Sequence, residues 1–162
     1  MTALAIPEIG WYVLADARLH ASTVEGLETK ADRDGFVRAD ISIADGRIKG
    51  IAARGDRPLP PRSVNLSGRI VLPAFVDCHT HLDKGHIWPR MPNPDGSFMG
   101  ALTAVGTDRM AFWNARDVER RMDFSLRTAY AHGTKAIRTH LDSVFPQETI
   151  SWDVFTAMRE RW

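Results

Sequence analysis

Two histidines separated by one residue have the clearest chemical potential in this sequence. His79 and His81 follow the apolar run 70–78, which is typical of a buried strand entered through a bend at Pro73. Because side chains alternate along a strand, residues i and i+2 share a face, and both imidazoles can reach one metal ion. The other interpretation is that both are polar side chains at the rim of a sheet, satisfied by water. On its own the pair makes a metal site a hypothesis.

The charge balance indicates a small substrate. The chain has 21 Lys and Arg against 20 Asp and Glu, and its formal net charge is +1. Such a balance creates no field that would attract nucleic acid or an anionic membrane surface. No segment reaches the ~18 apolar residues of a membrane span, and residues 1–10 lack the features of a signal peptide. We therefore expect no nucleic-acid partner and no membrane partner.

The single cysteine bears on compartment and packing. Cys78 excludes an internal disulfide, because it is the only cysteine in the chain. Its place in the apolar run predicts a buried thiol beside the histidines. A chain without disulfides is typical of a reducing compartment, so the expected location is cytoplasmic.

Residues 1–70 predict strands of a β-sandwich. Asp45-Gly46 is a two-residue turn of the kind that joins antiparallel strands, and the segments on both sides of it are rich in strand formers. A proline-rich connector over 55–62 separates this hairpin from one further strand. The expected strands are 11–20, 39–44, 47–51 and 63–67.

Residues 71–162 predict a different architecture, in which strands and helices alternate as in parallel β/α units. Asn114 can cap a helix that runs to Gly133, with apolar residues from Val118 to Tyr130 in the core. A strand over 134–141 follows. A last helix is expected to begin at Ser151 and to bury Trp152, Phe155 and Met158. Residues 85–106 are expected to form a long loop that acts as a lid or pocket wall.

The sequence around the histidines resembles a known family. The phrase Val71–Lys84, the tripeptide Gly96-Ser-Phe98 and the segment Ile137–Asp142 are similar to motifs of the amidohydrolase superfamily, in its cytosine deaminase-like branch. Ala74 stands where that family usually has a glycine. The resemblance implies an α/β fold: a (β/α)8 TIM-like barrel of a metal-dependent hydrolase, preceded by strands of a β-sandwich.

Length decides how much of that fold to expect. A barrel of this kind typically needs about 250 residues, and this chain has 162. The expectation is an N-terminal portion, truncated in the barrel: composite sandwich strands over 1–70 and the first two β/α units over 71–162. The alternative is a complete small domain, since a chain of this length can bury an adequate core.

The resemblance also implies a site. It makes His79 and His81 ligands of one divalent ion, Fe2+ or Zn2+, whose bound hydroxide releases ammonia from a cytosine-like N-heterocycle. The family's other ligands and its glutamate proton shuttle come from later barrel strands. We therefore expect the 162-residue chain alone to hold metal weakly and to be inactive.

Four further residues are site candidates with two interpretations each. By resemblance His140 lines the site, or it is a hydrogen-bonded histidine in a strand-end turn. Asp83 and Asp142 each either accept a hydrogen bond from a ligand imidazole and so orient it, or begin a turn. By resemblance Phe98 covers the substrate ring, and the alternative is that it anchors a loop. Lys84 is expected to pair with Asp83 or to point outward, because a cation beside a divalent ion is unfavourable.

Two competing functions remain open at this stage. One is a sister activity on the same metal frame, such as hydrolysis of an N-alkyl group from an s-triazine or another cyclic amide. The other is an inactive truncated fragment or an assembly module. Unpaired strand edges would favour a homo-oligomer or association with a missing C-terminal segment.

Overall fold

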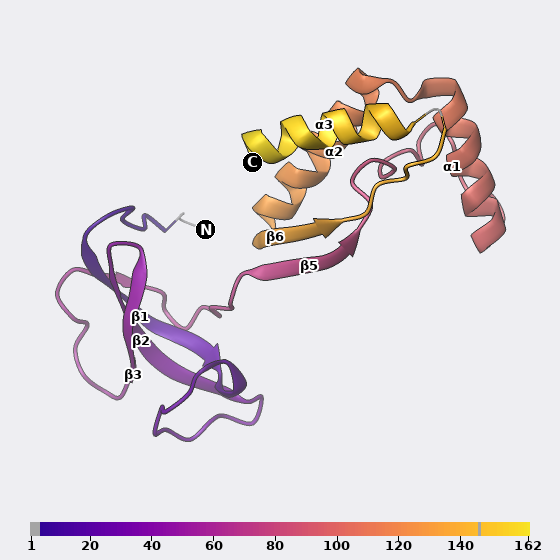
Figure 1. Ribbon diagram of the computed structural model, residues 1–162. Coiled ribbons are helices and arrows are strands. Elements are labelled where there is room, and N and C mark those ends of the chain that lie inside the picture. The colour runs from indigo at the N-terminus through magenta and orange to yellow at the C-terminus, as the bar shows by residue number, and fades with distance from the viewer. Residues whose placement is uncertain (1–3, 146) are drawn as a thin grey trace. The chain divides into compact units, whose positions relative to one another are not determined.

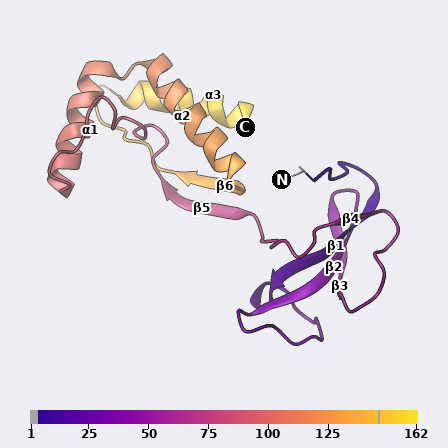
Figure 2. The ribbon, with the colours of Figure 1, turned by 180° about the vertical axis from the view of Figure 1, so that it is seen from behind.

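A computed structural model describes residues 4–145 and 147–162 of the chain. The chain divides into two compact units, Met1–Pro73 and Ala74–Trp162, which can be followed by colour in Figure 1 and from behind in Figure 2. Within the described residues, no helix has the length and apolar character needed to cross a membrane.

The first unit is built on a four-stranded sheet with the order β3-β2-β1-β4. Asp45 and Gly46, with φ values of 51° and 70°, form the turn between antiparallel β2 and β3, so the predicted hairpin is confirmed. The fourth strand is parallel to β1 and shorter than expected. The elements are β1 (Trp11–His20), η1 (Ala21–Thr23), β2 (Phe36–Ala44), β3 (Arg47–Ala53) and β4 (Ser63–Asn65).

One face of this sheet holds the core of the first unit. Ala17 and Ala39 are fully buried, and Leu19, Val37 and Ile41 pack with them. A second sheet, which a sandwich requires, is not formed by the described residues of this unit. The composite sandwich stays a prediction.

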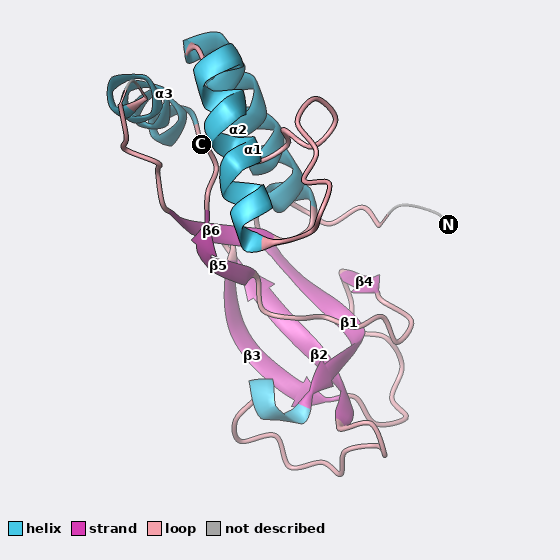
Figure 3. Cartoon of the chain, turned by 90° about the vertical axis from the view of Figure 1, so that its right-hand side faces the viewer, coloured by secondary structure: helices cyan, strands magenta, loops and turns pink. Residues whose placement is uncertain are grey.

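The second unit alternates strands and helices, as Figure 3 shows. β5 and β6 are parallel neighbours, which confirms the expected parallel β/α arrangement. Val118 and Met122 of α2 are fully buried and pack with Val154 and Met158 of α3. The elements are β5 (Phe75–Thr80), α1 (Phe98–Phe112), α2 (Ala115–Ala131), β6 (Thr134–Thr139) and α3 (Glu148–Arg161).

The prediction of a buried strand carrying a buried thiol is wrong. β5 begins only at Phe75, which is 53% exposed, and the next residue, Val76, is 67% exposed. Cys78 is exposed as well. Among the described residues β5 has a strand neighbour on one edge only, so its apolar side chains lack the cover that a complete sheet would give them.

The prediction of a loop over 85–106 is also wrong, because α1 begins at Phe98. Ser97 caps this helix: its hydroxyl accepts a hydrogen bond from the Gly100 N–H at 2.9 Å, and its own N–H donates to Asp95 at 2.9 Å. The two glycines inside the helix are poor helix formers and conceal it in the sequence.

Two helical predictions need smaller corrections. The cap of α2 is confirmed, since the Asn114 side chain accepts a hydrogen bond from the Asp117 N–H, but Tyr130 is 73% exposed. α3 begins at Glu148 rather than Ser151, and its Trp152 is 51% exposed. Met158 is buried as expected. The face of α3 that packs on α2 carries Ser151, Val154 and Met158, which leaves Trp152 outside it.

An ion-pair network around the buried Asp108 ties the segment after β5 to two helices. The Arg90 guanidinium donates to both oxygens of Asp108, at 2.7 and 2.8 Å, and to Asp117 at 2.6 Å. Asp108 is fully buried and also accepts a hydrogen bond from the Trp113 indole at 2.7 Å. This bidentate arrangement is the strong form of an arginine–carboxylate contact. It fixes the loop that leads from the histidines to α1.

We expect Arg90→Met to destabilise the protein by about 3 kcal/mol or more, because it leaves the Asp108 carboxylate buried without its cation. The measurement is urea unfolding. Arg116→Met is the matched control, since Arg116 is exposed and no described residue pairs with it; it should change stability by less than about 0.5 kcal/mol. Equal losses in the two variants would contradict the role given to Arg90.

The same network predicts that the free energy of unfolding depends on pH in the acid range. Burial raises the pKa of Asp117, but hydrogen bonds from Arg90 and Arg121 outweigh it and hold the pKa below its ordinary 3.8. The resulting stabilisation is complete above the unfolded pKa and is lost as pH falls through the lower folded pKa. Asp117→Asn should therefore cost stability at pH 7 and reduce the difference in unfolding free energy between pH 7 and pH ~2. An unchanged pH difference would refute this assignment.

Candidate metal and substrate site

Three histidine rings lie together at the carboxyl ends of the two parallel strands. His79 is in β5, His81 follows its last residue, and His140 follows β6. The ring centroids of His79 and His81 are 5.8 Å apart, and His140 lies 4.5 Å from the first and 5.6 Å from the second. The His140 N–H donates to the carbonyl of Thr80 at 2.8 Å, which extends the pairing of the strands to their ends. This is the edge of a parallel sheet at which barrel enzymes place their active sites.

Asp83 connects the segments that leave the two strands. Its side chain is fully buried, and its Oδ2 accepts a hydrogen bond from the Asp142 N–H at 2.8 Å. The Arg121 guanidinium donates to the backbone carbonyl of Asp83 and, at 3.1 Å, to that of Gly85. The backbone around His81 and the backbone after His140 are thereby held together.

Asp142 lies between a histidine and a lysine. Its Oδ1 is 3.5 Å from Nδ1 of His81 and accepts a hydrogen bond from Nζ of Lys84 at 3.0 Å. The expectation that Lys84 pairs with Asp83 or points outward is therefore wrong. The physical reason is that the Asp83 carboxylate is buried and bonded to the Asp142 backbone, so the Asp142 carboxylate is the anion left for Lys84.

Burial lowers the pKa of His81, and the positive charge of Lys84 acts in the same direction against the opposing charges of Asp142 and Asp83. A lowered pKa keeps the imidazole neutral near pH 7, and only the neutral ring has a lone pair to offer a metal ion. Nδ1 of His81 is buried and has no hydrogen-bond partner among the described residues.

The donor chemistry fits part of a metal site. The two imidazoles of His79 and His81 are of a ligand type suited to Zn2+ or Fe2+. Within residues 4–145 and 147–162, no group of three or more His, Cys, Asp and Glu side chains is arranged to hold an ion. These residues therefore fit two positions of a larger ligand set.

The remaining candidates are placed as follows. Phe98 is the first residue of α1 and is 77% exposed, and in the described part of the chain no ring contact joins it to the histidines. Arg109 was missed by the sequence analysis. Its Nη1 lies 3.9 Å from Oδ2 of Asp142, and no sequence signal could find it once α1 was taken for a loop.

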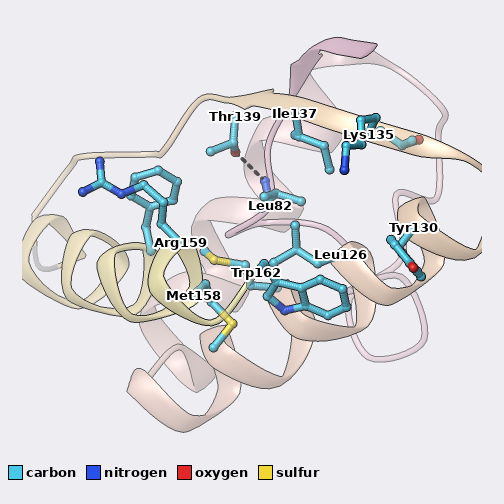
Figure 4. A pocket seen from close by; sticks show the side chains of 12 residues that line it. Leu82, Leu126, Tyr130, Lys135, Ile137, Thr139, Met158, Arg159 and Trp162 are labelled. Atoms are coloured by element: carbon cyan, nitrogen blue, oxygen red, sulfur yellow. Dashed lines mark hydrogen bonds between the residues drawn. The ribbon is translucent and has the colours of Figure 1, made fainter. Parts of the chain in front are cut away.

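A pocket of about 350 Å3 lies beside this site without including the histidines. Its walls come from α2, α3 and β6, and most of its lining is apolar, as Figure 4 shows. Leu82 and Thr139 both line it, and the Leu82 N–H donates to the Thr139 hydroxyl at 3.1 Å, the dashed line in Figure 4. The pocket belongs to the packing of helices on the sheet.

Comparison with known proteins shows which enzymes the chain is similar to. No family model matches it. It is 53% identical over 156 residues to the pterin deaminase of Rhizobium rhizogenes, which covers 96% of this chain and 36% of that protein. Its structure is similar to the 5-methylcytosine deaminase of Klebsiella pneumoniae (TM-score 0.69, 21% identity, 92% of this chain and 33% of that one). It is also similar to the N-isopropylammelide isopropylaminohydrolase of Burkholderia multivorans (TM-score 0.55, 25% identity, 93% and 35%).

The chain spans between 33% and 36% of the length of these relatives. Its mixed α/β fold matches the N-terminal parts of TIM-barrel enzymes. Deaminases of this kind depend on a metal ion. The chain is similar over nearly its whole length to the N-terminal part of enzymes of the amidohydrolase superfamily.

Proposed function

We propose that the protein carrying this chain is a metal-dependent hydrolytic deaminase of an aminated N-heterocycle of the pterin or cytosine kind. The observation that carries the proposal is the cluster of three imidazoles at the carboxyl ends of β5 and β6. The identity of 53% to a pterin deaminase supports the substrate class. In this reaction water adds to the ring carbon that bears the amino group, the carbon–nitrogen bond breaks, ammonia leaves and a carbonyl remains.

His79 and His81 would hold one divalent ion, Zn2+ or Fe2+, together with ligands from the part of the protein that this chain does not span. When bound, such an ion supplies the hydrolytic chemistry by lowering the pKa of water far enough to make it a nucleophile near neutral pH. The residues of this chain hold and orient the site. The Asp142 carboxylate lies 3.5 Å from Nδ1 of His81, where it would orient the ring, and Asp83 fixes the backbone of Asp142.

Two aromatic side chains are proposed to meet the substrate. The His140 ring, 4.5 Å from His79, lies where it can hydrogen-bond to a heterocycle bound at the histidine cluster. Phe98 is exposed at the start of α1 and is proposed to cover the ring of the bound heterocycle. Neither role requires either residue to bind the ion.

The structural similarity to an N-isopropylammelide isopropylaminohydrolase favours one second candidate, hydrolysis of an N-alkyl group from an s-triazine. The two activities share the attack of water on an amidine-like carbon and differ in the leaving group. Ammonia leaves in one and an alkylamine in the other, so product analysis separates them.

The test uses the protein at its natural length, supplied with pterin, cytosine and an N-alkyl aminotriazine in separate assays. We expect ammonia from the first or second compound and about one equivalent of bound divalent metal. His79→Ala with His81→Ala should abolish metal binding and lower kcat/KM by roughly a thousandfold or more, since metal-assisted attack is lost. Elemental analysis and ammonia release are the measurements.

His132→Ala is the matched control, because His132 is exposed at the end of α2, where its Nδ1 lies 2.7 Å from the Thr128 carbonyl. It should keep both metal and activity. A wild-type protein that releases only alkylamine would replace the deaminase proposal with the triazine activity. A protein that binds no metal and turns over none of the three compounds would point to the non-enzymatic module.

A further inference from the structure

Two cations reach the Asp142 carboxylate from different elements. Nζ of Lys84, in the segment after β5, donates to Oδ1 at 3.0 Å, and Nη1 of Arg109, on α1, lies 3.9 Å from Oδ2. The backbone N–H of Asp142 is fixed separately by the buried Asp83. Both oxygens and the main chain of this one residue are therefore restrained. The remaining contact of Oδ1 is with Nδ1 of His81 at 3.5 Å.

We propose that Lys84 and Arg109 are positioning residues, which hold the Asp142 carboxylate on the Nδ1 side of His81 and so leave Nε2 as the nitrogen that faces the ion. The inference rests on the proposed function in taking His81 as a metal ligand. It adds what sets the orientation and tautomer of that ligand, and it gives a role to two cations that the proposed reaction does not use.

A carboxylate close to a divalent ion is itself a good ligand, so something must keep Asp142 outside the ligand set. The Lys84 bond to Oδ1 is a charge-assisted hydrogen bond, which is short and strong, and the Arg109 guanidinium adds a longer charge contact to Oδ2, so the carboxylate gains little by moving to a metal ion. An acceptor fixed beside Nδ1 keeps the proton on that nitrogen and the lone pair on Nε2. Metal-binding histidines depend on such partners for ring orientation and basicity.

An ordinary surface ion pair explains the contacts less well. The Lys84, Arg109 and Asp142 side chains are only 26%, 20% and 21% exposed. Nε of Arg109 is buried without a hydrogen-bond partner among the described residues. A freely solvated pair would not desolvate a guanidinium in this way, and exposed pairs contribute little. Nδ1 of His81 and Oδ1 of Asp142 are 3.5 Å apart, which is within ion-pair range although it is not a hydrogen bond.

The test is made first on the metal-free protein at its natural length, labelled with 15N. Two-bond 1H–15N correlations report which imidazole nitrogen carries the proton. His132 serves as an internal reference in the same sample, because its Nδ1 lies 2.7 Å from a backbone carbonyl and must donate. Wild-type His81 should show the Nδ1–H tautomer. The double variant Lys84→Met with Arg109→Met should show a mixture of the two tautomers.

The second measurement is zinc affinity by competition with a chelator. Loss of such partners typically weakens metal binding by about 10- to 100-fold, which is the loss expected for the double variant and for Asp142→Asn. Lys84→Arg keeps the positive charge at this position, so this single variant should retain most of the wild-type zinc affinity. The control is Lys49→Met with Arg116→Met, two exposed cations for which the described structure shows no ion pair; it should match wild type in both measurements.

The proposal is overturned if the double variant keeps the His81 tautomer and a zinc affinity within about twofold of wild type. Circular dichroism and the amide spectrum show whether each variant is folded. If the double variant does not fold, Asp142→Asn, which keeps the side-chain shape, tests the same positioning role. A wild-type protein that binds no zinc, with a tautomer that still depends on both cations, would refute the proposed function and leave the positioning role standing.

Discussion

The buried carboxylate of Asp83 is the constraint on which the candidate site depends. A carboxylate without exposure to water needs compensating hydrogen bonds, and the Asp142 N–H supplies one at 2.8 Å. The bond joins residues 59 positions apart, one after each parallel strand. Because the backbone is fixed on both sides, His81 and His140 have little freedom to separate, and the three imidazoles stay within 6 Å of one another.

A second network continues that constraint toward the helices. Arg121 of α2 binds the Asp83 carbonyl and also pairs with Asp117, which Arg90 holds from the other side. Arg90 then reaches the buried Asp108 of α1. Asp108 precedes Arg109, so the link that fixes α1 also determines where the Arg109 guanidinium lies. These ion pairs, together with the hydrogen bond from Arg121 to the Asp83 carbonyl, therefore form one path from α1 and α2 to the segment that follows His81.

Local signals in the sequence predicted the elements, and contacts between distant residues decided what the sequence could not show. The Asp45-Gly46 hairpin, the Asn114 cap and the period-two spacing of His79 and His81 each depend on a few neighbouring residues. The partner of Lys84 lies 58 positions away, and the exposure of Cys78 depends on which strands flank β5. The start of α1 has a local signal in Asp95 and Ser97, but Gly100 and Gly106 inside the helix are poor helix formers and conceal it.

The charges around the histidines explain how a lysine can lie so close to a candidate cation site. The repulsion between two positive charges grows as the distance or the dielectric constant falls. Lys84 alone would therefore weaken the binding of a divalent ion nearby. Oδ1 of Asp142 lies between Lys84 and His81, and its negative charge offsets that repulsion. Its hydrogen bond to Lys84 also fixes the position of the carboxylate. The lysine therefore costs the site little and holds the carboxylate beside the ring. We therefore expect Asp142→Asn to weaken metal binding more than Lys84→Met does. Asp142→Asn removes the anion that compensates the lysine charge, whereas Lys84→Met removes only the group that holds this anion in place.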